Sequence, residues 1–224
     1  MIKFLAAITM LIDHIGVILF PQSLSLRCIG RISMPLFAYC VARGFYYSRK
    51  KGSHLRYCRN MTIFATVSQV PFYMVCGKGY NIGYTWLFSI VLLVIVTWDK
   101  TPLWKRLTAF SVALGLVVAF VQFGGFAVDY GVGGIVTPLL FYLFIATDKE
   151  NPTNHMIAVL GGWGVYCLCS GSVAALSQIF SLASVPVLAM AKKHDRKVNL
   201  PKWFFYGFYP VHLLLLLLIR GLLN

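Results

Sequence analysis

An aspartate and a histidine stand side by side, Asp13 and His14, in the middle of an apolar segment that runs from Phe4 to Phe20. A segment of this composition is long enough to cross a bilayer. Ionisable side chains at such a depth are costly, and they mark a substrate path, a proton relay or a reacting site. Histidine also has an ordinary pKa, about 6.5, that suits a general base near neutral pH. The pair Asp13–His14 is therefore the first candidate site for chemistry.

A second histidine, His212, lies in the last apolar segment of the chain. With a helical rise of about 1.5 Å per residue, His14 lies about 18 Å and His212 about 14 Å from the first residue of its segment, in a bilayer core about 30 Å thick. Arg31 lies about 5 Å from the start of the second segment. Its long side chain could extend toward Asp13, where a paired charge costs far less than an unpaired one. The two histidines are thus predicted at comparable depth near the midplane.

Neighbouring residues on a helix project about 100° apart, so Asp13 and His14 cannot reach one substrate atom by the same route. The arrangement that this favours has His14 facing a cavity, with Asp13 holding either His14 or Arg31 in place. Other polar groups lie outside the apolar segments: Asn81 opens the fourth, and Asp129-Tyr130 precedes the sixth. Asn81 and Asp129 are open to a second interpretation, as helix N-caps.

The elements that must position these side chains are membrane-spanning helices. Of the 224 residues, 59% are hydrophobic and only 12% are charged, whereas a soluble domain carries about a quarter charged residues. The net charge of +14 could indicate a nucleic-acid partner, but the basic residues concentrate in short loops between apolar runs, which topology explains better. No nucleic acid is therefore expected. The six cysteines form no CxxC pair, and no metal is expected.

Hydropathy and helix breakers predict an all-α fold, a polytopic transmembrane bundle of about nine spans that forms a single domain over residues 1–224. The first segment has no small-residue cleavage site and is interpreted as a retained span rather than a signal peptide. Lys3 and the basic residues of alternate loops fall on one side, which places the N-terminus in the cytoplasm and the C-terminus outside. The spans are predicted near residues 2–20, 28–47, 60–76, 83–98, 107–123, 131–147, 156–170, 173–191 and 203–223.

Several short motifs, in a fixed order along almost the whole chain, carry a family resemblance. They are Met10-Leu11-Ile12-Asp13-His14-Ile15-Gly16, Gly30-Arg31-Ile32, Pro35-Leu36-Phe37, Ser68-Gln69-Val70-Pro71-Phe72, Asn81-Ile82, Asp129-Tyr130-Gly131 and Phe205-Tyr206-Gly207-Phe208-Tyr209-Pro210-Val211-His212-Leu213. With these motifs the chain resembles the TraX family, whose name-giving member is the pilin N-acetylase of conjugative plasmids. The resemblance implies a multi-pass protein of the bacterial inner (cytoplasmic) membrane.

TraX proteins in turn look like distant relatives of the membrane acyltransferases that acetylate sugars from cytoplasmic acetyl-CoA. Those enzymes carry a basic residue and a histidine separated by ten residues in the first span, and Lys3 and His14 have that spacing. The resemblance implies an acetyltransferase that takes acetyl-CoA as its donor. Lys3 would bind a CoA phosphate at the cytoplasmic mouth, with Arg31 as a second donor-binding residue.

Acetyl transfer needs a base for the acceptor's proton and a donor or cation near the developing oxyanion. His14 is expected as the base, with Asp13 as its support, and Arg31 or a helix terminus serves the oxyanion. His212 is left with three possible roles, which are to orient His14, to contact the thioester or to act as a second proton carrier.

The acceptor, a pilin-like protein or a glycan, is expected to enter from the outer side. The residues expected to meet it are Asn81, Asp129, Tyr130 and Tyr209.

Two other function classes remain open. A proton-coupled transporter or channel would use the same buried Asp, His and Arg as a relay or an ion site. A non-catalytic membrane assembly factor would use them as polar contacts between helices. Both alternatives keep the lipid bilayer as a partner and differ from the enzyme in needing no acetyl-CoA.

Overall fold

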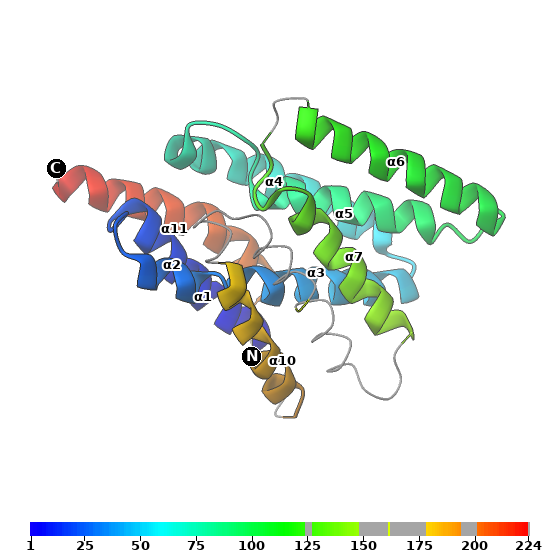
Figure 1. The fold of residues 1–224 in the computed structure, drawn as a ribbon, viewed down its shortest axis with the longest axis horizontal. Helices are drawn as coiled ribbons and strands as arrows, with labels where there is room; N and C mark the ends of the chain where they lie inside the picture. The colour runs from blue at the N-terminus through cyan, green and yellow to red at the C-terminus, as the bar shows by residue number, and fades with distance from the viewer. Residues whose placement is uncertain (124–126, 148–160, 162–177, 194–200, 224) are drawn as a thin grey trace. The chain divides into compact units, whose positions relative to one another are not determined.

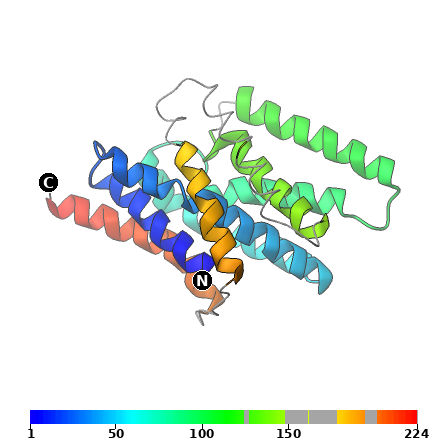
Figure 2. The ribbon, with the colours of Figure 1, turned by 60° about the horizontal axis from the view of Figure 1, so that its bottom comes forward.

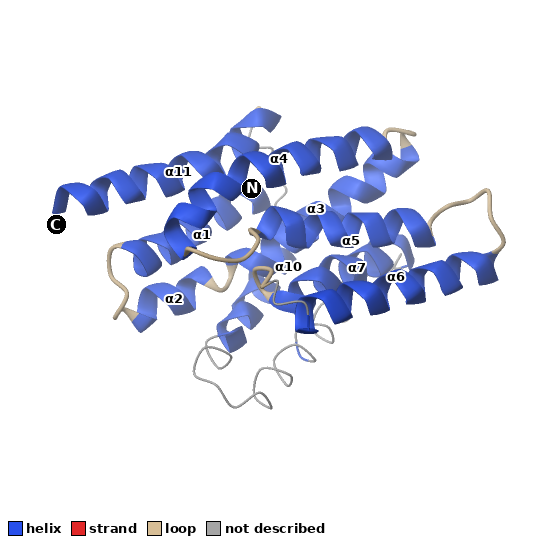
Figure 3. Ribbon diagram, turned by 90° about the horizontal axis from the view of Figure 1, so that it is seen from above, coloured by secondary structure: helices blue, strands red, loops and turns tan. Residues whose placement is uncertain are grey.

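The computed structural model describes residues 1–123, 127–147, 161, 178–193 and 201–223. These residues are almost entirely helical, and the one β contact among them is an isolated parallel bridge between Tyr80 and Val128 (Figure 3). The prediction of an all-α fold is confirmed for this part of the chain. The chain divides into two compact units, Met1–Cys40 with Phe144–Asn224 and Val41–Leu143. A single domain over residues 1–224 therefore stays a prediction.

The first unit contains both histidines of the predicted site, His14 and His212. Its helices are α1 (Ile2–Ile18), α2 (Leu24–Gly30), the first part of α3 (Ser33–Lys50), η1 (Gln178–Ala183), α10 (Ser184–Lys193) and α11 (Lys202–Leu223). Helix α1 packs against α2 and against α11 (Figure 1). It also contacts α10, which lies beside it in Figure 2. Helix α1 is therefore the central element of this unit.

Helices α1 and α2 form a tight hairpin. The turn between them is closed by a hydrogen bond from the Ser23 amide to the Phe20 carbonyl, at 2.9 Å. A Cβ on Gly16 would lie 2.9 Å from Cβ of Leu26, and a Cβ on Gly30 would overlap the side chain of Asp13. Small residues allow this kind of close backbone approach between helices in membranes. Gly30 thus brings the α2 backbone directly onto Asp13.

The second predicted span, 28–47, differs from the structure at its N-terminal end. Helix α2 already begins at Leu24 and ends at Gly30, and α3 starts afresh at Ser33. Pro35 supplies the reason, because in an unbroken helix its ring would collide with the carbonyl of Arg31, four residues earlier, whereas a proline in the first turn of a new helix is tolerated. The two helices together still form one apolar stretch, Leu24–Lys50.

The second unit contains the remaining part of α3 and four further helical segments. They are α4 (His54–Cys76), α5 (Ile82–Val96), α6 (Leu103–Phe123) and α7 (Gly131–Thr147) as far as Leu143. Helix α5 packs against α4 and α6. Pro71 lies inside α4, which continues through it as one helix.

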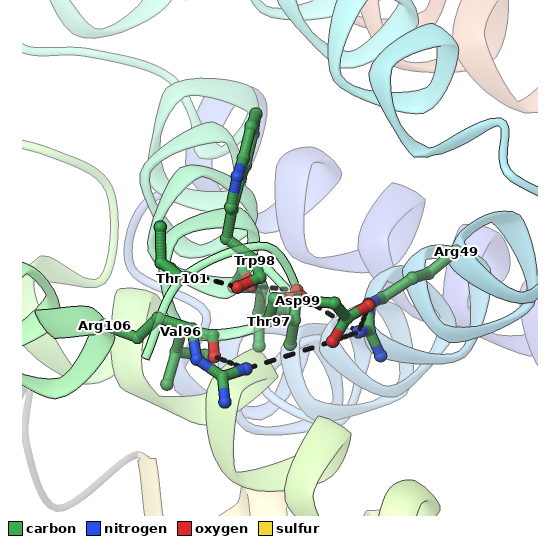
Figure 4. A network of polar contacts seen from close by, with 8 residues as sticks. Arg49, Val96, Thr97, Trp98, Asp99, Thr101 and Arg106 are labelled. Atoms are coloured by element: carbon green, nitrogen blue, oxygen red, sulfur yellow. Dashed lines mark hydrogen bonds and ion pairs between the residues drawn. The ribbon is translucent and has the colours of Figure 1, made fainter. Parts of the chain in front are cut away.

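Two arginines hold the C-terminal end of α5 (Figure 4). Arg49 of α3 donates from Nη2 to the Thr97 carbonyl at 2.9 Å and to Oδ1 of Asp99 at 2.6 Å. Arg106 of α6 donates to the Val96 carbonyl at 3.4 Å. The last carbonyls of a helix lack intrahelical partners, and basic side chains there satisfy them and oppose the helix dipole. Because the Asp99 side chain is 76% exposed, its ion pairs contribute little, and the carbonyl bonds carry the stabilisation.

Within the part of the chain that the structure describes, three helical stretches are long and apolar enough to cross a membrane. They are Leu24–Lys50, Leu103–Val121 and Trp203–Leu223. None of the apolar window of the second stretch is buried, which is the exposure expected of a helix that faces lipid. Apart from residue 161, the predicted span 156–170 lies outside the described residues, and so do residues 173–177 of the next span. The chain is a helical membrane protein.

Candidate functional site

The structure brings His14 of α1 and His212 of α11 into direct contact. Nδ1 of His14 lies 2.7 Å from Nε2 of His212, and the two rings meet end to end, with centroids 4.9 Å apart and planes inclined by 29°. Nδ1 of His212 lies 2.6 Å from the carbonyl oxygen of Phe208, one turn earlier in α11. His212 is 5% exposed, whereas His14 is partly exposed. The two histidines, 198 residues apart in sequence, form one hydrogen-bonded unit.

Aromatic rings surround this histidine pair. Tyr209 presents a ring edge to His14, with centroids 5.8 Å apart, and to His212, with centroids 5.7 Å apart. Phe208 stacks on His212 at 4.7 Å, and Phe204 stacks on Phe208 at 6.0 Å. Such contacts hold the plane of a ring as well as burying it. Tyr209, expected to meet the acceptor, therefore packs against both histidines.

Lys3 and His14 face the same neighbouring helix. They are eleven residues apart, close to three helical turns, so they lie on one face of α1, about 16 Å apart along its axis. Lys3 lies over the ring of Phe205, its Nζ 5.5 Å from the ring centroid, and the side chain is exposed. Phe205 and His212 are both in α11. The seam between α1 and α11 thus has the exposed Lys3 ammonium at the N-terminal ends of the two helices and the histidine pair about three turns further along α1.

Asp13 points to the other side of α1, toward α2. Arg27 donates from Nη1 to both carboxylate oxygens of Asp13, at 3.1 Å each. Arg31 is buried, and the charges of both arginines act on Asp13 and on His14. The structure therefore separates the adjacent pair, with Asp13 paired to α2 and His14 paired to α11.

Arg27 is the residue of this site to which the sequence pattern assigned no role. It precedes Arg31 by four residues, and Arg31 is the helical C-cap of α2. Residues four apart lie on one face of a helix. The four-residue spacing could have indicated that Arg27 and Arg31 act together. It is informative only if the helix begins before residue 27, and the predicted span began at residue 28.

Asn81 belongs to the second unit and is the N-cap of α5. Its side-chain oxygen accepts from the Gly83 amide at 2.7 Å. Its amide group donates to the Ala65 carbonyl at 2.7 Å and to Oε1 of Gln69 at 2.9 Å. The side chain is fully buried, and both of its donor hydrogens are used. The capping interpretation accounts for these bonds, and a role in acceptor binding stays a prediction.

Asp129 and Tyr130, also in the second unit, form the turn that leads into α7. The Asp129 carbonyl accepts a hydrogen bond from the Thr85 hydroxyl at 2.9 Å. Tyr130 has a φ of 61°, a left-handed conformation that is strained for a bulky residue and occurs where the surrounding structure enforces it. The contact of Asp129 and Tyr130 with an acceptor stays a prediction.

The arrangement in the first unit can perform acid–base chemistry. A partly exposed imidazole, a second imidazole bonded to it and two nearby guanidinium groups are the groups that proton transfer and oxyanion stabilisation require. Within the described residues, no group of three His, Cys, Asp or Glu side chains is placed to hold a metal ion.

Comparison with known proteins agrees with the motifs. The TraX protein family model matches residues 1–220. A probable fimbrial assembly protein of Dichelobacter nodosus, FimC of serogroup H1, is 24% identical over 245 aligned residues, which cover 96% of this chain and 92% of that protein. An uncharacterised protein of Rickettsia prowazekii is 48% identical over 46 residues, which cover 20% of this chain and 18% of that protein. No solved structure matches the chain. As its motifs predict, the chain belongs to the TraX family.

Proposed function

We propose that this chain is a membrane-embedded acetyltransferase that moves an acetyl group from cytoplasmic acetyl-CoA to an acceptor at the outer side of the membrane. The observation that carries the proposal is the His14–His212 pair, a partly exposed imidazole bonded to a buried one inside a membrane protein. Histidine and arginine side chains within a bilayer are costly, and a reacting site explains that cost.

The residues of the α1–α11 seam fit acetyl-CoA as a donor. The exposed ammonium of Lys3 is the kind of group that binds a phosphate, and it lies on the same face of α1 as His14. When bound, acetyl-CoA supplies an activated thioester. Lys3 would hold the phosphate end, and Arg31 is the second donor-binding residue that we propose.

His14 is the base in this proposal. Forming the bond from the acceptor nitrogen or oxygen to the acetyl carbon breaks the carbon–sulfur bond, so one proton leaves the acceptor and the departing thiolate gains one. Neutral His14 takes the first proton and gives it up again. In this proposal the guanidinium groups of Arg27 and Arg31, whose charges act on His14, stabilise negative charge that develops beside it.

The similarity to the probable fimbrial assembly protein of Dichelobacter nodosus supports a pilin-like acceptor. A glycan is the alternative acceptor, because the sugar-acetylating acyltransferases carry the same spacing of a basic residue and a histidine. The name of that relative also supports a second candidate function, a non-catalytic assembly factor, in which the histidines would be polar contacts between helices.

We also propose that the chain lies in the inner membrane of a bacterium, with about nine spans and the N-terminus in the cytoplasm. The positions of Lys and Arg in the sequence support this orientation, since they concentrate in alternate loops.

The test is mass spectrometry of envelope proteins and glycans from cells with and without the chain, which looks for an added acetyl group. Wild type and the control His54→Ala, a histidine at the start of α4, are expected to produce it, and His14→Ala is expected to lose it. Full acetylation with His14→Ala would overturn the assignment of His14. Acetylation that does not depend on the chain would favour the assembly factor, and substrate flux in proteoliposomes without CoA would favour a transporter.

A further inference from the structure

The two hydrogen bonds of His212 determine where the protons of the histidine pair lie. The first partner is the Phe208 carbonyl oxygen, 2.6 Å from Nδ1 of His212. A carbonyl oxygen can only accept, so Nδ1 must carry the hydrogen. A neutral imidazole has a single N–H, and Nε2 of His212 is therefore an acceptor.

The acceptor nitrogen of His212 in turn determines the tautomer of His14. Nε2 of His212 lies 2.7 Å from Nδ1 of His14, and since Nε2 accepts, Nδ1 of His14 donates. The one hydrogen of neutral His14 is thereby used, and its Nε2 carries a free lone pair. We propose that His14 acts as the base through Nε2, and that His212 is a positioning residue that holds His14 in this tautomer and orientation. The proposal rests on the acetyltransferase function above and assigns the roles within its histidine pair.

The packing of the pair supports this division of roles. Both ring nitrogens of His212 are engaged, its ring is stacked on Phe208, and it is 5% exposed. His212 therefore has no nitrogen left to meet a thioester or to receive the acceptor's proton. His14 is partly exposed and has one nitrogen to spare. Of the three roles that the sequence left open for His212, the geometry points to orientation.

The protonation pattern can be measured without any acetylation assay. The full chain, labelled with ¹⁵N-histidine and held in detergent or nanodiscs, gives separate ring-nitrogen signals for the two tautomers. His14→Asn and His212→Gln assign the two residues among the five histidines. We expect a protonated Nδ1 and an unprotonated Nε2 at both His14 and His212. A hydrogen on Nε2 of neutral His14 would overturn the proposal, whether or not the chain proves to be an acetyltransferase.

Kinetics then separate the positioning residue from the base. His14→Asn keeps a donor near the Nδ1 position but has no base, so we expect a loss of at least about 100-fold in kcat with unchanged Tm. His212→Gln places an acceptor oxygen near the Nε2 position, and we expect it to lose about 10-fold in kcat, with KM for acetyl-CoA unchanged. His212→Leu has no acceptor and is expected to lose about 100-fold, as misorientation of a reacting group can. If His212→Gln were as inactive as His14→Asn, His212 would be a second proton carrier and the proposal would be wrong.

Discussion

Asp13 of α1 and Arg27 of α2 form an ion pair at 3.1 Å, in which the aspartate side chain is 9% exposed and the arginine side chain 29%. The pair closes the α1–α2 hairpin one residue from His14. An ion pair inside a membrane protein gains little net stability over an apolar contact, but loss of one partner leaves an uncompensated charge. The finding makes Arg27 a residue of the site, and it predicts an asymmetry between the two partners.

Arg27→Ala is expected to destabilise the protein more than Asp13→Ala. The first variant leaves the buried Asp13 carboxylate with less compensation, at a cost of about 2 kcal/mol. The second leaves a long, partly exposed guanidinium that can turn toward polar surroundings, and costs about 1 kcal/mol. The double variant should cost less than the sum of the two. Thermal unfolding in detergent measures this, with the exposed arginine of α11, Arg220→Ala, as the control. Equal losses for both single variants would contradict the asymmetry.

Gly30→Ala tests the close approach of α2 to α1. The new methyl group would overlap the side chain of Asp13, so either the hairpin opens or the Asp13–Arg27 pair shifts. We expect a loss of about 1–3 kcal/mol, as for overpacking in a core. Gly207→Ala in α11 is the matched control, because its methyl group would meet nothing within 4 Å, and it should be neutral or stabilising by about 0.5 kcal/mol. A Gly30→Ala protein with the Tm of the wild type would show that the hairpin is looser than the structure describes.

Hydropathy was sufficient to predict most helices, because an apolar run bounded by charged or turn residues leaves few alternatives. The runs predicted at 2–20, 131–147 and 203–223 match α1, α7 and α11 to within two residues at each end. The break between α2 and α3 was missed because both helices are apolar, and hydropathy averages over the break. Pro35 marks it, but a proline can also lie inside a helix, as Pro71 and Pro138 do.

The candidate site was predictable only in part, for a physical reason. The depth of a residue follows from the helical rise, so His14 and His212 could be placed at similar height from the sequence alone. Which helices are neighbours depends on packing across almost the whole chain, and this decides that His14 meets α11 while Asp13 meets α2. The cap at Asn81 was open to sequence reasoning because capping is local.

Lys3 is predicted to bind a phosphate of acetyl-CoA. Lys3→Ala should raise KM for acetyl-CoA about 10-fold, equivalent to about 1.4 kcal/mol, with little change in kcat, because the contact is remote from the reacting atoms. The effect should shrink at high salt, which screens exposed charges. Lys3→Arg should keep most of the affinity, and Lys78→Ala, another exposed lysine, is the control. A fall in kcat with unchanged KM would move Lys3 from donor binding to the chemistry.

The proposed topology predicts different labelling of two native cysteines. Cys76 is exposed and ends α4, whereas Cys58 lies near the start of the same helix. In chains that keep one of them and carry serine at the other cysteine positions, a membrane-impermeant maleimide should label Cys76 from the outer side of intact spheroplasts. Cys58 should react only after the membrane is opened, and a permeant maleimide controls for its partial burial. The reverse pattern would invert the orientation.

The number of spans requires a second site, because α4 reports only its own direction. Leu223→Cys, in a chain without other cysteines, lies at the exposed end of α11. An odd number of spans puts this residue outside when the N-terminus is inside, so it should label together with Cys76. Labelling of Leu223→Cys only after permeabilisation would mean an even number of spans. In that case α11 would run from the outside inward, and Lys3 and the start of α11 would lie on opposite faces. The packing of Lys3 on Phe205 argues against this, since Phe205 lies in the first turn of α11 and Lys3 in the first turn of α1.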